Sequence, residues 1–150
     1  MRLRYFGYYF EELANHSRTR QEIMPLLDAY CKFDNSRFKN SFQHNDETVF
    51  LLKERDNHYI FVKTKDTELI KTVNRADVAI EEIAAKLAGN ESIGFASHLY
   101  VTNEFIAFGS THLAPTVSCF SEFINTLLHK LGCSSHRFMI YPLVTQITRG

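Results

Sequence analysis

Histidine is the side chain in this sequence that could do the most chemistry, and there are seven of them. Imidazole acts as a general base near neutral pH and as a metal ligand. A zinc-binding helix carries two histidines four residues apart, but no two histidines here have that spacing, and Cys-x-x-Cys is absent. His129 and Cys133 are four apart, but Gly132 should end a helix between them. We therefore expect no metal ion and no other cofactor, with the histidines exposed or hydrogen-bonded; a site assembled from distant residues stays open.

The sequence also lacks the known motifs for a catalytic nucleophile or a phosphate-binding loop. The sequence contains no Gly-x-Gly-x-x-Gly, no Walker lysine motif and no Gly-x-Ser-x-Gly. Glu81 and Glu82 are adjacent, but neighbouring residues of a helix point in different directions, so a solvated helix face is expected. We therefore expect a protein that is not an enzyme, and keep a nuclease as the alternative that metal-dependent DNA cleavage would support.

One stretch could form a basic surface for nucleic acid. It contains Lys53, Arg55, Lys63, Lys65, Lys71 and Arg75. Such side chains bind phosphates by releasing counterions, and the interleaved Tyr59 and Phe61 could stack on exposed bases. Acidic residues are interspersed, so an ordinary mixed-charge surface remains the other interpretation.

Composition limits the class of protein. The chain has 150 residues, of which 45% are hydrophobic, and 17 basic residues balance 17 acidic ones. This is typical of one globular domain, and any nucleic-acid contact must depend on a local patch. No segment has the length of a signal peptide or membrane span, and the odd number of cysteines suggests reduced thiols in or near the core. These features predict a cytoplasmic protein.

The elements that must position these residues follow from hydrophobic periodicity. Strands are predicted at 48–54 and 58–64, joined by a short polar turn, and a second hairpin leads into 105–110. Helices are predicted from about Met24, at 66–73, at 77–89 and after Thr116, with a last strand at 137–144. Because hairpins dominate, we expect an α+β fold with a mostly antiparallel sheet packed against two or three helices.

Individual residues refine these elements. Thr19 and Glu22 have capping-box spacing at the start of the first helix. Leu131 is expected on the apolar stripe of the helix after Thr116, and Gly132 should end that helix. Pro142 should place the last strand at a sheet edge or a bulge.

The stretch "GNESIGFASHLYV" (89–101) raises the question of a ligand loop. Its apolar side chains at 93, 95, 99 and 101 alternate with small or polar ones, which predicts a strand with one face in the core. His98 then lies on the other face with Tyr100, and a structural role is expected for it.

Three blocks of the sequence resemble the RexA proteins of lambdoid prophages. They are "FVKTKDTELIKTVNRADVAIEEIAAKLAGNESIGFASHLYV" (61–101), "IAFGSTHLAPTVSCFSEFI" (106–124) and "RFMIYPLV" (137–144). They follow the family's order and nearly its spacing, whereas the first 45 residues resemble it only faintly. None of the blocks is a catalytic signature, so the specificity of the resemblance lies in their shared order.

The resemblance implies a non-enzymatic role in phage exclusion. RexA-like proteins bind double-stranded DNA as dimers without strong sequence preference, and signal to a membrane-channel partner, RexB, that aborts the infection. Lys63, Lys71 and Arg75 match basic positions of the family pattern, and with Lys65 they are the candidate DNA-binding residues.

Two points stay open at this stage. The family continues beyond the point where this sequence ends, so residues 1–150 correspond to an N-terminal domain or to a single-domain relative. The chain then contacts DNA itself or regulates a DNA-binding or dimerisation domain. The main alternative is a protein-interaction or dimerisation module without DNA contact, with the aromatic residues of "RYFGYYF" (4–10) at its interface.

Overall fold

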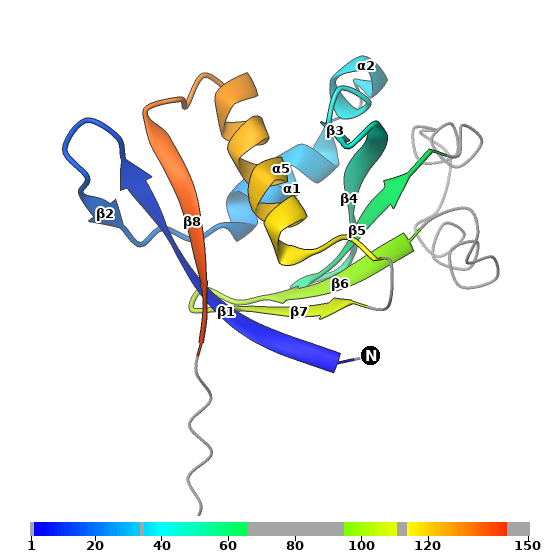
Figure 1. Cartoon of the computed structure of the whole chain (residues 1–150), viewed down its shortest axis with the longest axis horizontal. Helices are drawn as coiled ribbons and strands as arrows, with labels where there is room; N and C mark the ends of the chain where they lie inside the picture. The colour runs from blue at the N-terminus through cyan, green and yellow to red at the C-terminus, as the bar shows by residue number, and fades with distance from the viewer. Residues whose placement is uncertain (1, 34, 66–94, 111–113, 144–150) are drawn as a thin grey trace, which may run out of the picture.

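A curled antiparallel sheet forms the framework of the protein in the computed structural model (Figure 1). The structure describes residues 2–33, 35–65, 95–110 and 114–143. In these ranges the strands are β1 (Arg2–Glu12), β2 (Arg18–Thr19), β3 (Gln43–His44), β4 (Glu47–Arg55), β5 (His58–Thr64), β6 (Phe95–Val101), β7 (Ile106–Ser110) and β8 (His136–Pro142). The helices are α1 (Met24–Lys32), α2 (Ser36–Lys39) and α5 (Val117–Lys130). The predicted α+β class is confirmed, while the helices predicted at 66–73 and 77–89 lie outside the described residues.

Strand β1 connects the two sides of this sheet. Seven strands follow the order β2-β1-β7-β6-β5-β4-β3, and β8 pairs with β1 off this path. Phe6 pairs with Ile106 of β7 and also with Pro142 of β8, so those two strands flank β1 on opposite sides. Among the described strands β8 pairs with β1 alone, which confirms the edge position predicted from Pro142.

Both predicted hairpins are present. In the first, β4 and β5 pair around a turn in which Asn57 adopts a left-handed conformation, with φ of 66°. In the second, β6 pairs with β7, and Leu99 and Val101 are fully buried while His98 and Tyr100 are half-buried on the other face. The predicted strand within 89–101 is therefore confirmed for its described part.

Helix α1 starts at Met24 as predicted, but the capping box predicted for Thr19 is wrong. Thr19 belongs to β2 and pairs with Phe10, so it is not available to cap a helix. The cap position is Ile23, and Pro25 occupies the first turn, where a missing backbone N–H costs nothing. No helix among the described residues is long and apolar enough to span a membrane.

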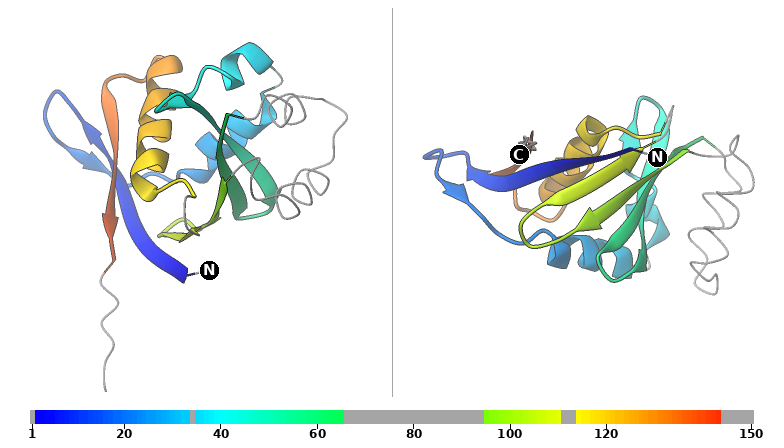
Figure 2. Two further views of the ribbon diagram at one scale, coloured as in Figure 1. Left: turned by 45° about the vertical axis from the view of Figure 1, so that its right-hand side comes forward. Right: turned by 90° about the horizontal axis from the view of Figure 1, so that it is seen from below.

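Helix α5 lies in the hollow of the curled sheet with α1 beside it (Figures 1 and 2). The Thr116 side chain accepts a hydrogen bond from the Cys119 N–H and so caps the first turn. The predicted apolar stripe is buried with one exception, because Leu131 is 39% exposed. The helix ends at Lys130, and Gly132 then turns the chain with φ of 79°, which takes Leu131 out of the buried face.

Phe120 and Phe123 of α5 are the centre of an aromatic core. The Phe123 ring lies 4.9 Å from Phe42, 5.0 Å from Tyr30 and 5.3 Å from Phe61, measured between ring centroids. The Phe120 ring contacts Phe61 as well, and reaches Phe138 of β8. Two side chains of one helix therefore join α1 to the inner strand β5 and to the edge strand β8.

Replacing Phe123 with alanine should strongly destabilise the protein. We expect F123A to lower the free energy of unfolding by about 3–5 kcal/mol, because the cavity it leaves is walled by three other rings. Chemical denaturation followed by circular dichroism measures this. The matched control L131A removes an exposed side chain directly after the same helix and should change stability by no more than about 0.5 kcal/mol. Equal losses in the two variants would contradict the central role of Phe123.

Candidate functional site

Lys63 is the best-placed of the candidate DNA-binding residues that the structure describes. It lies on β5, opposite Val49 of β4, and is half-buried. Its positive charge lowers the pKa of Cys119, whereas the charges of Glu122 and Glu47 raise it, so all four groups lie close together. The two carboxylates therefore offset part of the positive field that Lys63 presents.

Of the three other candidate DNA-binding residues, the structure describes only Lys65. Lys65 is exposed immediately after β5. Lys71 and Arg75 lie outside the described residues, so the structure does not bring the four candidates together. Their role in binding DNA stays a prediction.

Two features of the proposed basic strip are wrong. Tyr59 and Phe61 are fully buried, because they face α1 and α5, and so they cannot stack on nucleic-acid bases. The Lys53 ammonium lies 3.1 Å from the Asp28 carboxylate and 3.7 Å from that of Asp56. Asp28 also accepts a hydrogen bond from the Tyr59 hydroxyl, so this group of charges joins α1 to the hairpin.

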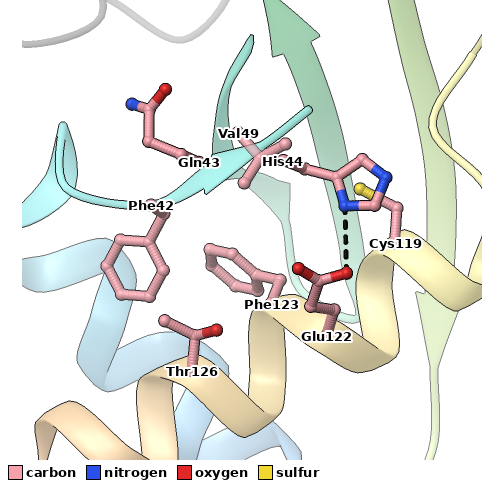
Figure 3. A pocket seen from close by; sticks show the side chains of 8 residues that line it. All are labelled: Phe42, Gln43, His44, Val49, Cys119, Glu122, Phe123 and Thr126. Atoms are coloured by element: carbon pink, nitrogen blue, oxygen red, sulfur yellow. Dashed lines mark hydrogen bonds and ion pairs between the residues drawn. The ribbon is translucent and has the colours of Figure 1, made fainter. Parts of the chain in front are cut away.

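A small pocket lies between β3, β4 and α5 (Figure 3). Its lining is Phe42, Gln43, His44, Val49, Cys119, Glu122, Phe123 and Thr126. The cavity volume of ≈ 10 Å³ is about the minimum for a single water molecule. His44 Nδ1 lies 3.0 Å from the Glu122 carboxylate, and Cys119 lines the same pocket (Figure 3). The pocket thus holds a thiol, an imidazole and a carboxylate in one place.

These three groups have the residue types of a cysteine nucleophile with its base. A reactive thiol, however, has a lowered pKa and is partly exposed. Cys119 is 2% exposed, and burial raises the pKa of its thiol to about 11. The thiol is therefore protonated at neutral pH and packs as a small apolar group, while the His44–Glu122 contact ties β3 to α5.

An open groove between α5 and the start of β8 contains a second polar group. His129 Nδ1 lies 2.8 Å from the Ser134 hydroxyl, and both residues are exposed. A serine nucleophile needs a histidine that a third group orients. No such contact to His129 is found among the described residues, so the pair acts as a surface hydrogen bond.

His58 and His98 are brought together although they are 40 residues apart. His58 Nε2 lies 3.0 Å from His98 Nδ1, and the Glu54 carboxylate lies 2.8 Å from the other ring nitrogen of His58. Burial lowers the pKa of His58, Glu54 raises it, and His98 and Arg55 lower it again, for a net downward shift. Sequence spacing missed this cluster because it depends on the pairing of β5 with β6. The one signal was that Glu54 and His58 flank the predicted turn.

Thiol labelling tests the description of Cys119. Iodoacetamide should modify Cys133, which is exposed, contrary to the expectation that every cysteine lies in or near the core. Cys119 is buried and should react only in denaturant, and the half-buried Cys31 should react more slowly than Cys133, since burial raises the pKa of both thiols, that of Cys31 to about 12. Peptide mass spectrometry reads out the sites. Rapid native labelling of Cys119 that H44A abolishes would instead indicate an activated nucleophile.

Comparison with known proteins supports the resemblance found in the sequence. The protein rexA of Escherichia phage lambda and that of Enterobacteria phage 434 are each 35% identical to this chain over 91 residues. The matched region is 61% of this chain but only 32% of each relative. A family model described as "RexA: Intracellular sensor of Lambda phage, Abi component" matches residues 1–150. Since that match covers the whole sequence, the chain belongs to the RexA family.

Proposed function

We propose that this chain is a non-enzymatic module of a prophage-encoded phage-exclusion system. The observation that carries the proposal is the family match over residues 1–150, since that family is described as an intracellular sensor and an Abi component. Residues 1–150 would form a single globular domain acting in the cytoplasm, and a membrane-channel partner of the RexB type would receive its signal. The protonated, buried Cys119 supports a role without catalysis.

Within this function we propose non-specific contact with double-stranded DNA through Lys63, Lys65, Lys71 and Arg75. Two observations support it: Lys65 is exposed at the end of β5, and Lys63 is only half-buried two residues earlier. The chain has no net charge, so binding would depend on these few phosphate contacts. Affinity should therefore be modest and sensitive to salt.

A gel-shift assay with a short DNA duplex tests this contact. We expect binding at low salt that weakens as salt is raised. Substituting Lys63, Lys65, Lys71 and Arg75 with glutamine one at a time should reduce the slope of log affinity against log salt by about one each. Unrelated duplex sequences should bind equally well, because phosphates carry no sequence information.

Lys32 supplies the matched control. It is exposed on the last turn of α1, so K32Q removes the same charge elsewhere on the surface and should leave the slope unchanged. If the chain does not bind DNA even at low salt, direct contact is wrong and the chain acts by regulating another domain.

A dimerisation module is the second candidate, and exposed aromatic residues favour it. Tyr5 and Tyr141 are each 42% exposed on the sheet face opposite the buried Phe6 and Tyr8. The Tyr141 ring lies directly against Gly7, where a Cβ atom would come within 2.5 Å of it, and 6.0 Å from the Tyr9 ring. Exposed tyrosines gathered on one strand pair are typical of an interface with a second copy of the chain.

Light scattering over a range of concentrations tests the dimer. We expect an increase in mass with concentration for the unmodified chain, and a loss of at least tenfold in dimerisation affinity for the double variant Y5A/Y141A, because it removes the aromatic contact area. L131A removes an exposed apolar side chain that belongs to neither β1 nor β8, and should associate normally. A mass that stays monomeric at every concentration would contradict this candidate.

A further inference from the structure

A cluster of three potential metal ligands lies on the face of the sheet opposite α5. It consists of Glu54 of β4, His58 of β5 and His98 of β6, which we call the histidine cluster. One donor atom from each residue can be chosen so that all three lie within 4.8 Å of one another. Neighbouring Tyr59 and Leu99 point into the core on the α5 side, so by strand alternation the cluster is on the other face.

The hairpin turn is built in a way that aims Glu54 at His58. The pairing of β4 with β5 shifts register between Lys53 and Arg55, which leaves Glu54 as the extra residue of a β-bulge. Bulges redirect side chains and occur often beside functional sites. Here the redirected carboxylate lies 2.8 Å from His58 Nδ1.

The same turn is fastened to the end of β6, which carries His98. The Asn57 side chain donates a hydrogen bond of 2.7 Å to the Val101 carbonyl, and the Val101 N–H donates one of 2.8 Å to the Asn57 carbonyl. The Tyr100 ring stacks on the His58 ring at 4.4 Å with an interplanar angle of 6°. The histidine cluster is therefore held in place by the backbone and by an aromatic contact before any ligand binds.

His58 Nδ1 is a buried nitrogen without a hydrogen bond. The residue is 5% exposed, and although the Glu54 carboxylate is close, it does not lie in the direction a hydrogen bond requires. An unsatisfied buried polar atom is uncommon and calls for a partner. The Glu54 carboxylate lies beside this nitrogen, and the His98 imidazole lies beside the other nitrogen of the same ring, Nε2, so the ring has a potential metal ligand on each side.

We propose that Glu54, His58 and His98 bind one divalent transition-metal ion of the Zn²⁺ type. Two imidazoles and one carboxylate suit zinc and its neighbours, whereas Mg²⁺ and Ca²⁺ prefer oxygen ligands alone. The 3.0 Å between His58 Nε2 and His98 Nδ1 is near the spacing of about 3.3 Å expected for two nitrogens on a tetrahedral zinc with bonds of about 2.0–2.1 Å. Glu54 lies beside the opposite nitrogen of the His58 ring, but its half-buried carboxylate is within 4.8 Å of a donor atom of His98, so its side chain must rotate towards His98 to complete the coordination.

The coordination would leave a fourth position open. Three protein ligands occupy three corners of a tetrahedron, and water or a group from a binding partner takes the remaining one. The ion would join three neighbouring strands, β4, β5 and β6, at one point. Binding should therefore raise the thermal stability of the chain as well as produce a spectroscopic signal.

Metal titration of the untagged, metal-free chain tests the proposal. Co²⁺ should give visible absorption bands of a four-coordinate site at one ion per chain, and Zn²⁺ should displace it. Zn²⁺ should also raise the thermal midpoint, while Mg²⁺ at the same concentration should not. E54Q and H98Q should each weaken Co²⁺ binding at least tenfold and abolish the Zn²⁺-induced shift.

The controls separate this site from other ligands on the surface. H129A and H136A each remove a histidine that lines the groove between α5 and β8, close in sequence to the exposed Cys133; both variants should bind Co²⁺ normally. E54Q and H98Q are the variants used because Glu54 and His98 are half-buried, so their substitution should disturb folding less than that of the buried His58. Circular dichroism verifies that both variants fold. Absence of stoichiometric binding, or binding that E54Q and H98Q leave unchanged, would overturn the proposal and leave a hydrogen-bonded histidine pair. DNA binding can fail while this site binds metal, so the two proposals are tested separately.

Discussion

The packing of Phe120 and Phe123 into the hollow of the sheet is the interaction on which the remaining structure depends. An antiparallel sheet that curls must fill its concave side, and these two rings fill it from a single helix. They contact α1 through Tyr30, the central strands through Phe61 and the edge strand through Phe138. Every group discussed above takes its position from a strand or helix that this core holds.

Local sequence signals were sufficient for the elements that neighbouring residues define. Alternation predicted the β4–β5 and β6–β7 hairpins, and the cap at Thr116 with Gly132 set the ends of α5. The errors arose where a tertiary contact overrides a local preference. Thr19 has the side chain of a helix cap but is used as a strand residue, because Phe10 pairs with it. Leu131 continues the apolar spacing of α5, but the helix ends at Lys130, so the Leu131 side chain is exposed.

The pairing of His58 with His98 shows a second reason why the sequence alone could not predict the site. The relation of His58 to His98 is set by the register of β5 against β6, and 30 residues separate the end of one strand from the start of the other. No pattern within either strand specifies that register. The same limit applies to the pocket of His44 and Glu122, which come from β3 and α5. Tyr59 and Phe61 show the same limit. The sequence of the hairpin predicted its two strands but did not specify that these two rings would be buried in the core.

Burial and neighbouring charges determine what the polar groups beside α5 can do. Thiol, imidazole and carboxylate meet beside α5, but burial keeps the thiol protonated. The positive charge of Lys63 lies near two carboxylates, so a DNA contact at this place would be weak by itself and would gain from a second copy of the chain. The proposed DNA contact and the proposed self-association are thus compatible with each other.

The pairing of β1 has a consequence for how the chain reaches its native state. Arg2 pairs with Ser110, and Glu12 pairs with His136, so both ends of β1 join strands about a hundred residues later in the sequence. Contacts so distant in sequence close large loops, and proteins that rely on them fold slowly. During synthesis β1, with Phe6, Tyr8 and Phe10 along one side, must wait for most of the chain to emerge from the ribosome. The apolar side of β1 therefore stays without its native partners longer than those of the hairpin strands.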